Sequence, residues 1–185
     1  MLERSSFRGP FFYIKLHREM RYNCKKQEGI TMQLQFYEPS HQSLIDQYEL
    51  TEQQLRFTRH AKECVLLKSE TRSPILALVE GKLVTYFDLH RTEGVKPYSN
   101  NPNAILLRAF STDFRVQGKG YATKVLKLLP NFVRAHFPNV NEIVLAVNIE
   151  NHIAKELYEK HGFIDFGERR EGAKGELIIM SYRIE

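Results

Sequence analysis

The stretch "RVQGKGYATKVLKLL", residues 115–129, places two glycines one residue apart in front of apolar side chains at helical spacing. The segment before it, "AILLRAFST" at 104–112, is mostly apolar and predicts a buried strand. A strand that turns through Gly118 and Gly120 into a helix leaves main-chain N–H groups uncovered by Cβ atoms, at the positive end of the helix dipole. Such a turn is typical of anion sites and suits a pyrophosphate. The same glycines also fit a simpler interpretation, in which they only turn the strand into the helix.

Two known phosphate-binding motifs do not fit this stretch. A P-loop needs GxxxxGK followed by Ser or Thr, and no Gly-Lys pair here lies at that distance from another glycine. The dinucleotide fingerprint GxGxxG fails because Thr123 stands at the third glycine, and no acidic residue ends a strand about 20 residues further on. What remains is a strand, the pattern Arg115-x-x-Gly118-x-Gly120, and a helix.

Composition predicts one soluble globular domain. The chain has 185 residues, 42% hydrophobic and 26% charged, which is enough for a single domain with its own core. It has no apolar run of the roughly 20 residues that a helix needs to cross a bilayer, so we expect no membrane partner. Two cysteines, Cys24 and Cys64, support neither a disulfide framework nor a metal site. We therefore expect a cytoplasmic protein without a metal.

The net charge of +5 is concentrated at the N-terminus. Residues 1–31 hold seven Lys or Arg against three Glu, which leaves residues 32–185 nearly neutral. A basic leader is compatible with a nucleic-acid arm or a targeting peptide, but this one lacks a cleavage site and a long apolar region. Because Gln27–Gly29 is encodable by a purine-rich ribosome-binding sequence shortly before Met32, we expect the leader to be disordered or a start-site artefact. We expect no nucleic-acid partner, since no basic stripe with exposed aromatics follows Met32.

From Met32 onward, strand patterns and helix patterns alternate. Period-two or continuous apolar runs predict strands, and i+3/i+4 apolar spacing predicts helices. The class is α/β (α+β), with a β-α-β unit in the centre. Strands are expected at 32–39, 74–80, 83–90, 104–112, 142–148, 163–169 and 176–185, and helices at 121–133, at 151–162 and, as two short helices, between 40 and 64.

A second motif lies one predicted strand after the glycines. "VNIENHIAKELYEKHGF", residues 147–163, has the form V-x-x-x-N-x-x-A-x-x-L-Y-x-x-x-G-F. Together with the first motif, in this order and separation, it resembles the GNAT superfamily of acyl-CoA-dependent N-acyltransferases. The resemblance covers 32–185 and implies a mixed, twisted β-sheet of about six to seven strands, with helices on both faces and splayed central strands. The matching positions are Val147, Asn151, Ala154, Leu157, Tyr158, Gly162 and Phe163.

The resemblance implies that acetyl-CoA is the co-substrate and assigns its contacts by position. The pantetheine arm would lie along the main chain of the splayed strand, and the pyrophosphate on the N–H groups of 117–122. Arg115 or Lys119 would offset its charge, and Asn151 would hold either the helix start or the pantetheine. The implied binding residues are Phe110, Ser111, Thr112, Arg115, Gln117, Gly118, Lys119, Gly120, Tyr121, Ala122 and Asn151.

Tyr158 is the residue that the resemblance makes catalytic. Its hydroxyl would protonate the departing thiolate, while a backbone N–H of the splayed strand stabilises the oxyanion. The residue types alone leave other interpretations open. Tyr158 is also an ordinary core aromatic, Asn151 an N-cap, and Arg115 and Lys119 solvated charges at a helix start.

The general base is not identified by sequence. The strand at 104–112 offers no carboxylate, which leaves Glu80, Asp88, His90, Asp113 or a water chain.

We expect an N-acetyltransferase that moves an acetyl group from acetyl-CoA directly to a primary amine of a small molecule or of a protein or peptide. The alternative is a catalytically idle acyl-CoA-binding sensor. The acceptor site is expected in the loops around 40–62 and 91–103, which match no specific motif, and the protein is expected to be a monomer or homodimer.

Overall fold

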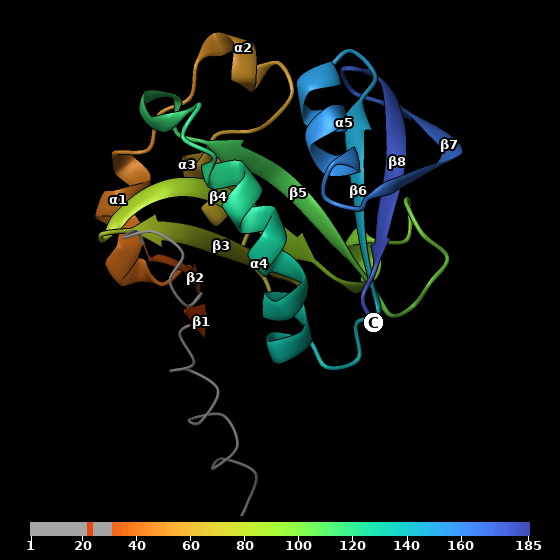
Figure 1. Ribbon diagram of the computed structural model, residues 1–185, viewed down its shortest axis with the longest axis horizontal. Helices are drawn as coiled ribbons and strands as arrows, with labels where there is room; N and C mark the ends of the chain where they lie inside the picture. The colour runs from red at the N-terminus through yellow and green to blue at the C-terminus, as the bar shows by residue number, and fades with distance from the viewer. Residues whose placement is uncertain (1–21, 24–30) are drawn as a thin grey trace, which may run out of the picture.

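The structure, a computed structural model, describes residues 22–23 and 31–185. Their strands form one mixed sheet in the order β1-β2-β3-β4-β5-β6-β8-β7 (Figure 1). Among these strands only β5 and β6 are parallel neighbours, and every other pair is antiparallel. The strands are β1 (Tyr22–Asn23), β2 (Met32–Phe36), β3 (Arg72–Val79), β4 (Lys82–His90), β5 (Ala104–Thr112), β6 (Glu142–Asn148), β7 (Ile164–Gly172) and β8 (Gly175–Arg183).

The seven strands from β2 to β8 confirm the expected class and strand number. β1 adds a two-residue strand that was not expected, where Tyr22 and Asn23 pair with Leu34 and Gln33 of β2. It lies within the leader predicted at 1–31. The rest of that prediction, at 1–21 and 24–30, lies outside the described residues.

Helices cover both faces of the sheet. α4 and α5 lie on one face, α3 lies on the other, and α2 stands above one end of the strands (Figure 1). The longest described helix has 16 residues, and no helix in the described part of the chain is long and apolar enough to span a bilayer. The helices are α1 (Gln42–Asp46), α2 (Glu52–Leu55), α3 (Ala61–Val65), α4 (Tyr121–His136) and α5 (His152–Glu159), with 3₁₀ turns at Pro39–His41, Thr92–Gly94 and Phe114–Val116.

The prediction of two short helices between 40 and 64 is wrong, because three are present. The capping box of Thr51 and Gln54 starts α2, as expected. The His60 side chain then accepts a hydrogen bond from the Lys62 N–H and starts α3 as a separate helix. A histidine cap is uncommon, so sequence patterns do not mark this boundary.

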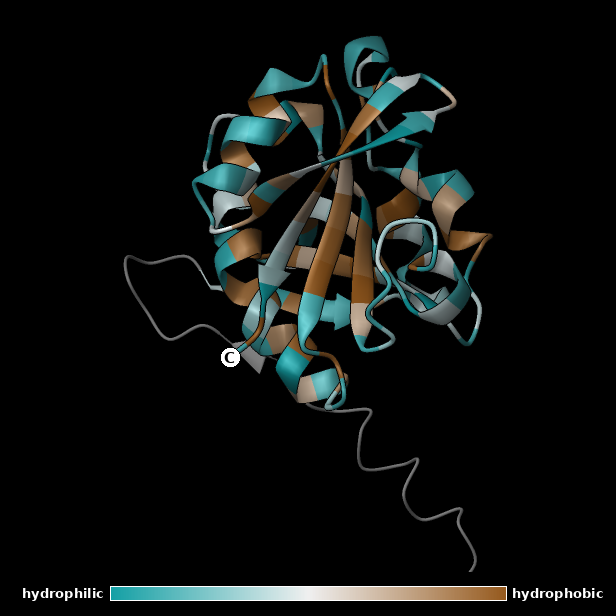
Figure 2. Ribbon diagram, turned by 90° about the vertical axis from the view of Figure 1, so that its right-hand side faces the viewer, coloured by the Kyte–Doolittle hydropathy of each residue, from teal (hydrophilic) through white to brown (hydrophobic). Residues whose placement is uncertain are grey.

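Alternate residues of the central strands enter two cores. In β3, Ile75 and Ala77 pack in the cluster that contains α4 and Tyr158, while Leu76 and Leu78 pack in the cluster of α1 and α3. Because both faces are covered, β3 and β4 are buried along almost their whole length, and most of their residues are apolar. Figure 2 shows the hydrophobic residues gathered along the strands of the sheet.

The ladder between β5 and β6 ends half-way along the two strands. Pairing runs from Ala104 with Glu142 to Leu107 with Leu145 and then stops. Beyond that point β5 continues to pair with β4, and β6 continues to pair with β8. We call the diverging part, 108–112 of β5 and 146–148 of β6, the splay. It confirms the expected divergence of the central strands, and a bulge at Ala109, with φ of +52°, lies at its start.

Candidate active site

The turn between β5 and α4 is built on two glycines in the left-handed region. Gly118 has φ of +75° and Gly120 has φ of +74°, and a Cβ atom on either would meet nothing within 4 Å. The requirement for glycine is therefore conformational, because L side chains are strained at these angles. Gly120 is the N-cap of α4, and no side chain caps this helix. The main chain of the turn is thus open to the outside.

The N–H groups of 118–123 carry no protein partner. Within the described residues, none of them donates a hydrogen bond to a main-chain or side-chain acceptor. They include the first N–H groups of α4, which have no acceptor within the helix. An anion placed here meets several donors and the positive end of a long helix. Five of the six predicted pyrophosphate donors, 118–122, belong to this open set.

The sixth, Gln117, and the predicted phosphate partner Arg115 are engaged elsewhere. The Gln117 N–H donates to the carbonyl of Phe114 at 3.4 Å. The Arg115 guanidinium donates to both carboxylate oxygens of Asp113, at 2.9 Å from Nε and 2.5 Å from one terminal nitrogen, and to the carbonyl of Gln47. Lys119 is exposed and forms no ion pair with a described residue, so it is the cation of the turn that is available to a phosphate.

The segment 47–54, which we call the strap, holds the C-terminal end of β5. The Tyr48 hydroxyl donates to the Ser111 carbonyl at 2.6 Å, and Gln54 Nε2 donates to the Thr112 carbonyl at 2.7 Å. The Glu49 N–H donates to Asp113 at 3.1 Å. These bonds fix the strand that forms one side of the splay.

The main-chain groups of the three predicted pantetheine residues point to opposite sides of β5. The Asp113 N–H donates to Val84 of β4, and N–H groups alternate sides along a strand. Ser111 therefore faces β4, and the main-chain groups of Phe110 and Thr112 face the splay. Thr112 also places its hydroxyl 3.2 Å from that of Thr85 on β4.

Tyr158 lies beside the splay. Its side chain is buried, and its ring packs against Phe110 of β5 at 6.1 Å and Phe163 at 5.7 Å between centroids. Burial raises the pKa of its hydroxyl well above the usual range, and the hydroxyl makes no hydrogen bond to another described residue. The structure therefore brings the predicted acid next to the predicted pantetheine strand and leaves its proton uncommitted.

Two asparagines close the other side of the site. Asn151 is the N-cap of α5, where its side chain accepts from the Ala154 N–H at 3.3 Å, so the helix-start role is the one seen. Asn148, at the end of β6, was not predicted. Its amide donates to the Lys174 carbonyl at 2.7 Å and accepts from the Glu150 N–H at 2.9 Å, tying β6 to the turn between β7 and β8.

The four predicted bases are occupied or distant. Asp88 is fully buried and binds Arg72 and the Tyr86 hydroxyl, and burial raises its pKa although both partners oppose this. Asp113 is also buried. Burial alone would raise its pKa, but the hydrogen bonds from Arg115 and from main-chain N–H groups hold it below the usual range.

Glu80 lies away from the splay, while His90 lies at its start, with its Nδ1 3.4 Å from the Arg108 guanidinium. Glu80 is exposed in the turn between β3 and β4. His90 pairs with Leu106, in the part of the sheet where β5 and β6 are still joined, and burial lowers its pKa.

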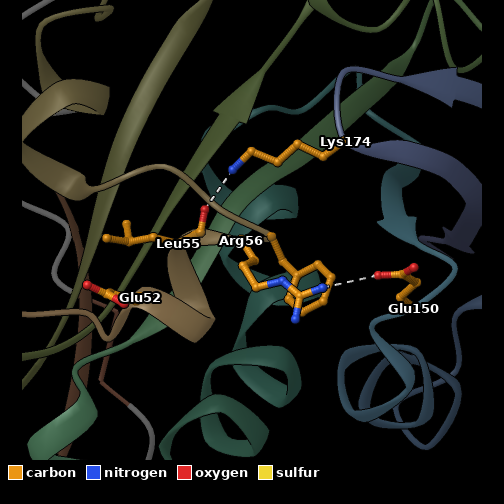
Figure 3. Close-up of a pocket in the computed structure, with 6 residues that line it drawn as sticks. Glu52, Leu55, Arg56, Glu150 and Lys174 are labelled. Atoms are coloured by element: carbon orange, nitrogen blue, oxygen red, sulfur yellow. Dashed lines mark hydrogen bonds and ion pairs between the residues drawn. The ribbon is translucent and has the colours of Figure 1, made fainter.

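A cavity of about 470 Å³ lies at the open end of the splay. One wall consists of the residues around α2, where Gln54 contacts β5. The opposite wall consists of Glu150, just after β6, and Lys174, between β7 and β8. Two contacts cross it: Arg56 to Glu150 at 3.4 Å, and Lys174 Nζ to the Leu55 carbonyl at 2.6 Å (Figure 3). The lining residues are Glu52, Leu55, Arg56, Phe57, Glu150 and Lys174.

The lining of this cavity overlaps only in part with the loops in which the acceptor site is predicted. Residues 52–57 belong to the expected loop at 40–62, but no residue of the loop at 91–103 lines this cavity. That loop packs elsewhere, with Val95 buried against Ala104 and Leu106. Glu150 and Lys174 were missed, because only the folded chain brings them opposite α2.

Comparison with known proteins identifies the family. The sequence model of the Acetyltransferase (GNAT) family matches residues 33–163. The chain is similar to the uncharacterized N-acetyltransferase YbbJ of Bacillus subtilis (strain 168), with 43% identity over 152 residues that cover 80% of this chain and 95% of that protein.

Two solved structures share the fold. AAC(6')-Ib in complex with paromomycin and acetyl-CoA has a TM-score of 0.67 at 17% identity, over 82% of this chain and 93% of the other. The ribosomal-protein-S18-alanine N-acetyltransferase from Escherichia coli has a TM-score of 0.61 at 17% identity, over 83% and 94%. The family match and the sequence identity to YbbJ agree with this fold, and the chain belongs to the GNAT acetyltransferase family.

Proposed function

We propose that the protein is an acetyl-CoA-dependent N-acetyltransferase that moves an acetyl group directly to a primary amine. The observation that carries the proposal is the position of the splay directly before the open turn at 118–122. The splay presents main-chain groups to an extended, amide-bearing chain, and the turn presents N–H groups to a pyrophosphate. Coenzyme A carries these two parts joined in one molecule. The fold neighbour AAC(6')-Ib was solved with acetyl-CoA bound.

Each part of the site has a defined task. The N–H groups of 118–122 hold the pyrophosphate, and Lys119 offsets its charge. The main-chain groups of Phe110 and the N–H of Thr112 pair with the pantetheine amides, while the Thr112 carbonyl accepts from Gln54. Arg115 acts indirectly, since it holds Asp113 and the strap rather than a phosphate.

The transfer needs one proton donor at the thioester. The amine nitrogen attacks the acetyl carbon, the C–N bond forms and the C–S bond breaks. The thiolate takes the proton of the Tyr158 hydroxyl, and the proton that the attacking nitrogen loses passes through solvent and restores that hydroxyl. A main-chain N–H of β5 at the splay stabilises the oxyanion. Burial keeps Tyr158 protonated at neutral pH but also makes it a weak acid. Its contribution is therefore expected at the low end of general-acid catalysis.

The acceptor must first lose a proton, since an alkylammonium has a pKa of about 10.4. None of the four predicted bases presents an uncommitted group at the splay. Water in the open cavity, in reach of the exposed Glu52 and Glu150, is the route that the arrangement supports best.

The test has two stages with the full-length protein. Calorimetric titration with acetyl-CoA is expected to show one saturable site, and a panel of primary amines is expected to give release of CoA thiol that depends on the amine. Absence of acetyl-CoA binding would overturn the proposal. Tight binding without thiol release for any amine would favour the idle acyl-CoA sensor instead.

A further inference from the structure

The cavity at the open end of the splay has balanced charge. Four of its six lining residues are charged, and they are two acids and two bases. Glu52 and Arg56 come from α2 and the residue after it, while Glu150 and Lys174 come from the opposite wall (Figure 3). Leu55 and Phe57 supply the apolar part of the lining. The cavity is a shallow hollow of about 470 Å³ that is largely open to solvent, so a small polar ligand would be held by its charged groups rather than enclosed.

The charges are held by contacts that exchange easily. The Arg56 and Glu150 side chains are 66% and 67% exposed, and an ion pair of this kind gains little over hydration. Arg56 also lies 5.5 Å above the Phe57 ring, which keeps its guanidinium at the cavity when the pair opens. Lys174 is bound only to a neutral carbonyl, that of Leu55. Both cations can therefore take an anionic group of a ligand.

Resting on the proposed acetyl transfer to amines, we propose that the acceptor is a free amino acid. Its carboxylate binds Arg56 and Lys174, and its amine binds Glu150, the residue that lies just after β6. A dipolar ligand brings no net charge into a cavity that has none. Its carboxylate also takes the place of Glu150 beside Arg56, and its amine takes the place of Arg56 beside Glu150.

Other classes of amine fit this cavity less well. A polycation meets two positive side chains, which oppose its binding. A simple alkylamine leaves both cations without an anionic partner. The N-terminus of a peptide lacks a carboxylate near its amine, so it is in the same position as the alkylamine.

The experiment compares matched acceptors on the full-length protein. Release of CoA thiol is measured for the common L-amino acids, for their amides, for the amines that lack the carboxyl group, and for the polycation paromomycin. We expect kcat/KM to be at least about tenfold higher for the best amino acid than for its amide or amine, the size of one charge-assisted contact.

Variants assign this preference to the cavity. R56A and K174A are each expected to lower the ratio of kcat/KM for the amino acid to that for its amide by about tenfold. The controls are R59A, an equally exposed arginine paired with Glu63 in the same loop, and K160A, an exposed lysine paired with Glu156. These two are expected to leave the ratio unchanged.

The outcomes separate this inference from the function on which it rests. Equal or better activity with amides, amines or paromomycin, or an unchanged ratio in R56A and K174A, overturns the amino acid as acceptor and leaves acetyl transfer intact. No thiol release with any acceptor, despite acetyl-CoA binding, overturns the proposed transfer itself.

Discussion

Two helices start directly after the two parallel strands, and they start in opposite ways. α4 follows β5 and begins at Gly120, with no side-chain cap. α5 follows β6 and begins at Asn151, whose side chain accepts from the Ala154 N–H. The second helix satisfies one of its first N–H donors with its own cap, while the first helix leaves all of these donors to water or to a ligand. Only the uncapped start of α4 leaves N–H groups available to an anion. Two similar strand-to-helix connections can therefore differ in whether they can bind a ligand.

The largest effect is expected from a substitution that covers the free N–H groups at the start of α4. Gly118→Val forces a branched side chain into φ of +75° and places its atoms before the free N–H groups, so acetyl-CoA binding is expected to fall below detection by calorimetry. Gly81→Val is the matched control, because Gly81 has φ of +76° and equally open surroundings in the turn between β3 and β4. Both variants should lose a similar stability, about 1–2 kcal/mol. If both bind acetyl-CoA normally, the glycines serve the turn alone.

The next effect concerns the tyrosine beside the splay. Tyr158→Phe is expected to lower kcat by roughly 10- to 100-fold. Acetyl-CoA affinity and melting temperature should be almost unchanged, because no described residue loses a hydrogen-bond partner when the hydroxyl is removed. Tyr48→Phe is the contrast: its hydroxyl binds Ser111, so stability should fall by about 1 kcal/mol. A Tyr158→Phe protein that melts much lower but turns over normally would make Tyr158 a core residue only.

A smaller effect is expected from the exposed cation of the turn. Lys119→Ala should weaken acetyl-CoA binding by about two- to fivefold, as for an exposed charge contact, and the difference should shrink at high salt. Lys127→Ala, exposed further along α4, is the control and should change nothing. A loss as large as that of Gly118→Val would mean that the lysine, rather than the backbone, carries the phosphate site.

The smallest effect on function is expected from substitutions of Asn151, the N-cap of α5. Asn151→Ala should cost about 1 kcal/mol of stability, and Asn151→Ser should recover most of it, since serine also caps helices. Acetyl-CoA affinity should remain within experimental error of wild type. A clear loss of affinity without a loss of stability would show that Asn151 contacts the pantetheine and that the two helix starts differ less than described.

The parts of the site that depend on local pattern were predictable. Glycine is the residue for positive φ, so Gly118 and Gly120 already indicate an open turn, and the apolar run before them indicates the buried strand. The splay was expected only from the family resemblance, because nothing in the residues of β5 and β6 says where their pairing ends.

The parts that depend on distant partners were not predictable. Arg115 looked available to a phosphate, yet it binds Asp113, two residues before it, and the carbonyl of Gln47 in the strap, 68 residues before it. Glu150 and Lys174 meet α2 across 94 and 119 residues of chain, and single charged residues leave no pattern that marks such a meeting. The choice among the candidate bases was left open for the same reason, since burial and distant partners decide which ionisable group is available.

The strap separates the residues that hold the cavity wall from those that face the cavity. Tyr48, Glu49 and Gln54 fasten the wall to β5. Glu52 of the strap and Arg56, two residues beyond it, line the cavity, and neither side chain bonds to a described strand of the sheet. Selection can therefore exchange the second set without loosening the first. If the proposed function holds, a substitution at Glu52 or Arg56 changes which amine the protein accepts and leaves its binding of acetyl-CoA intact.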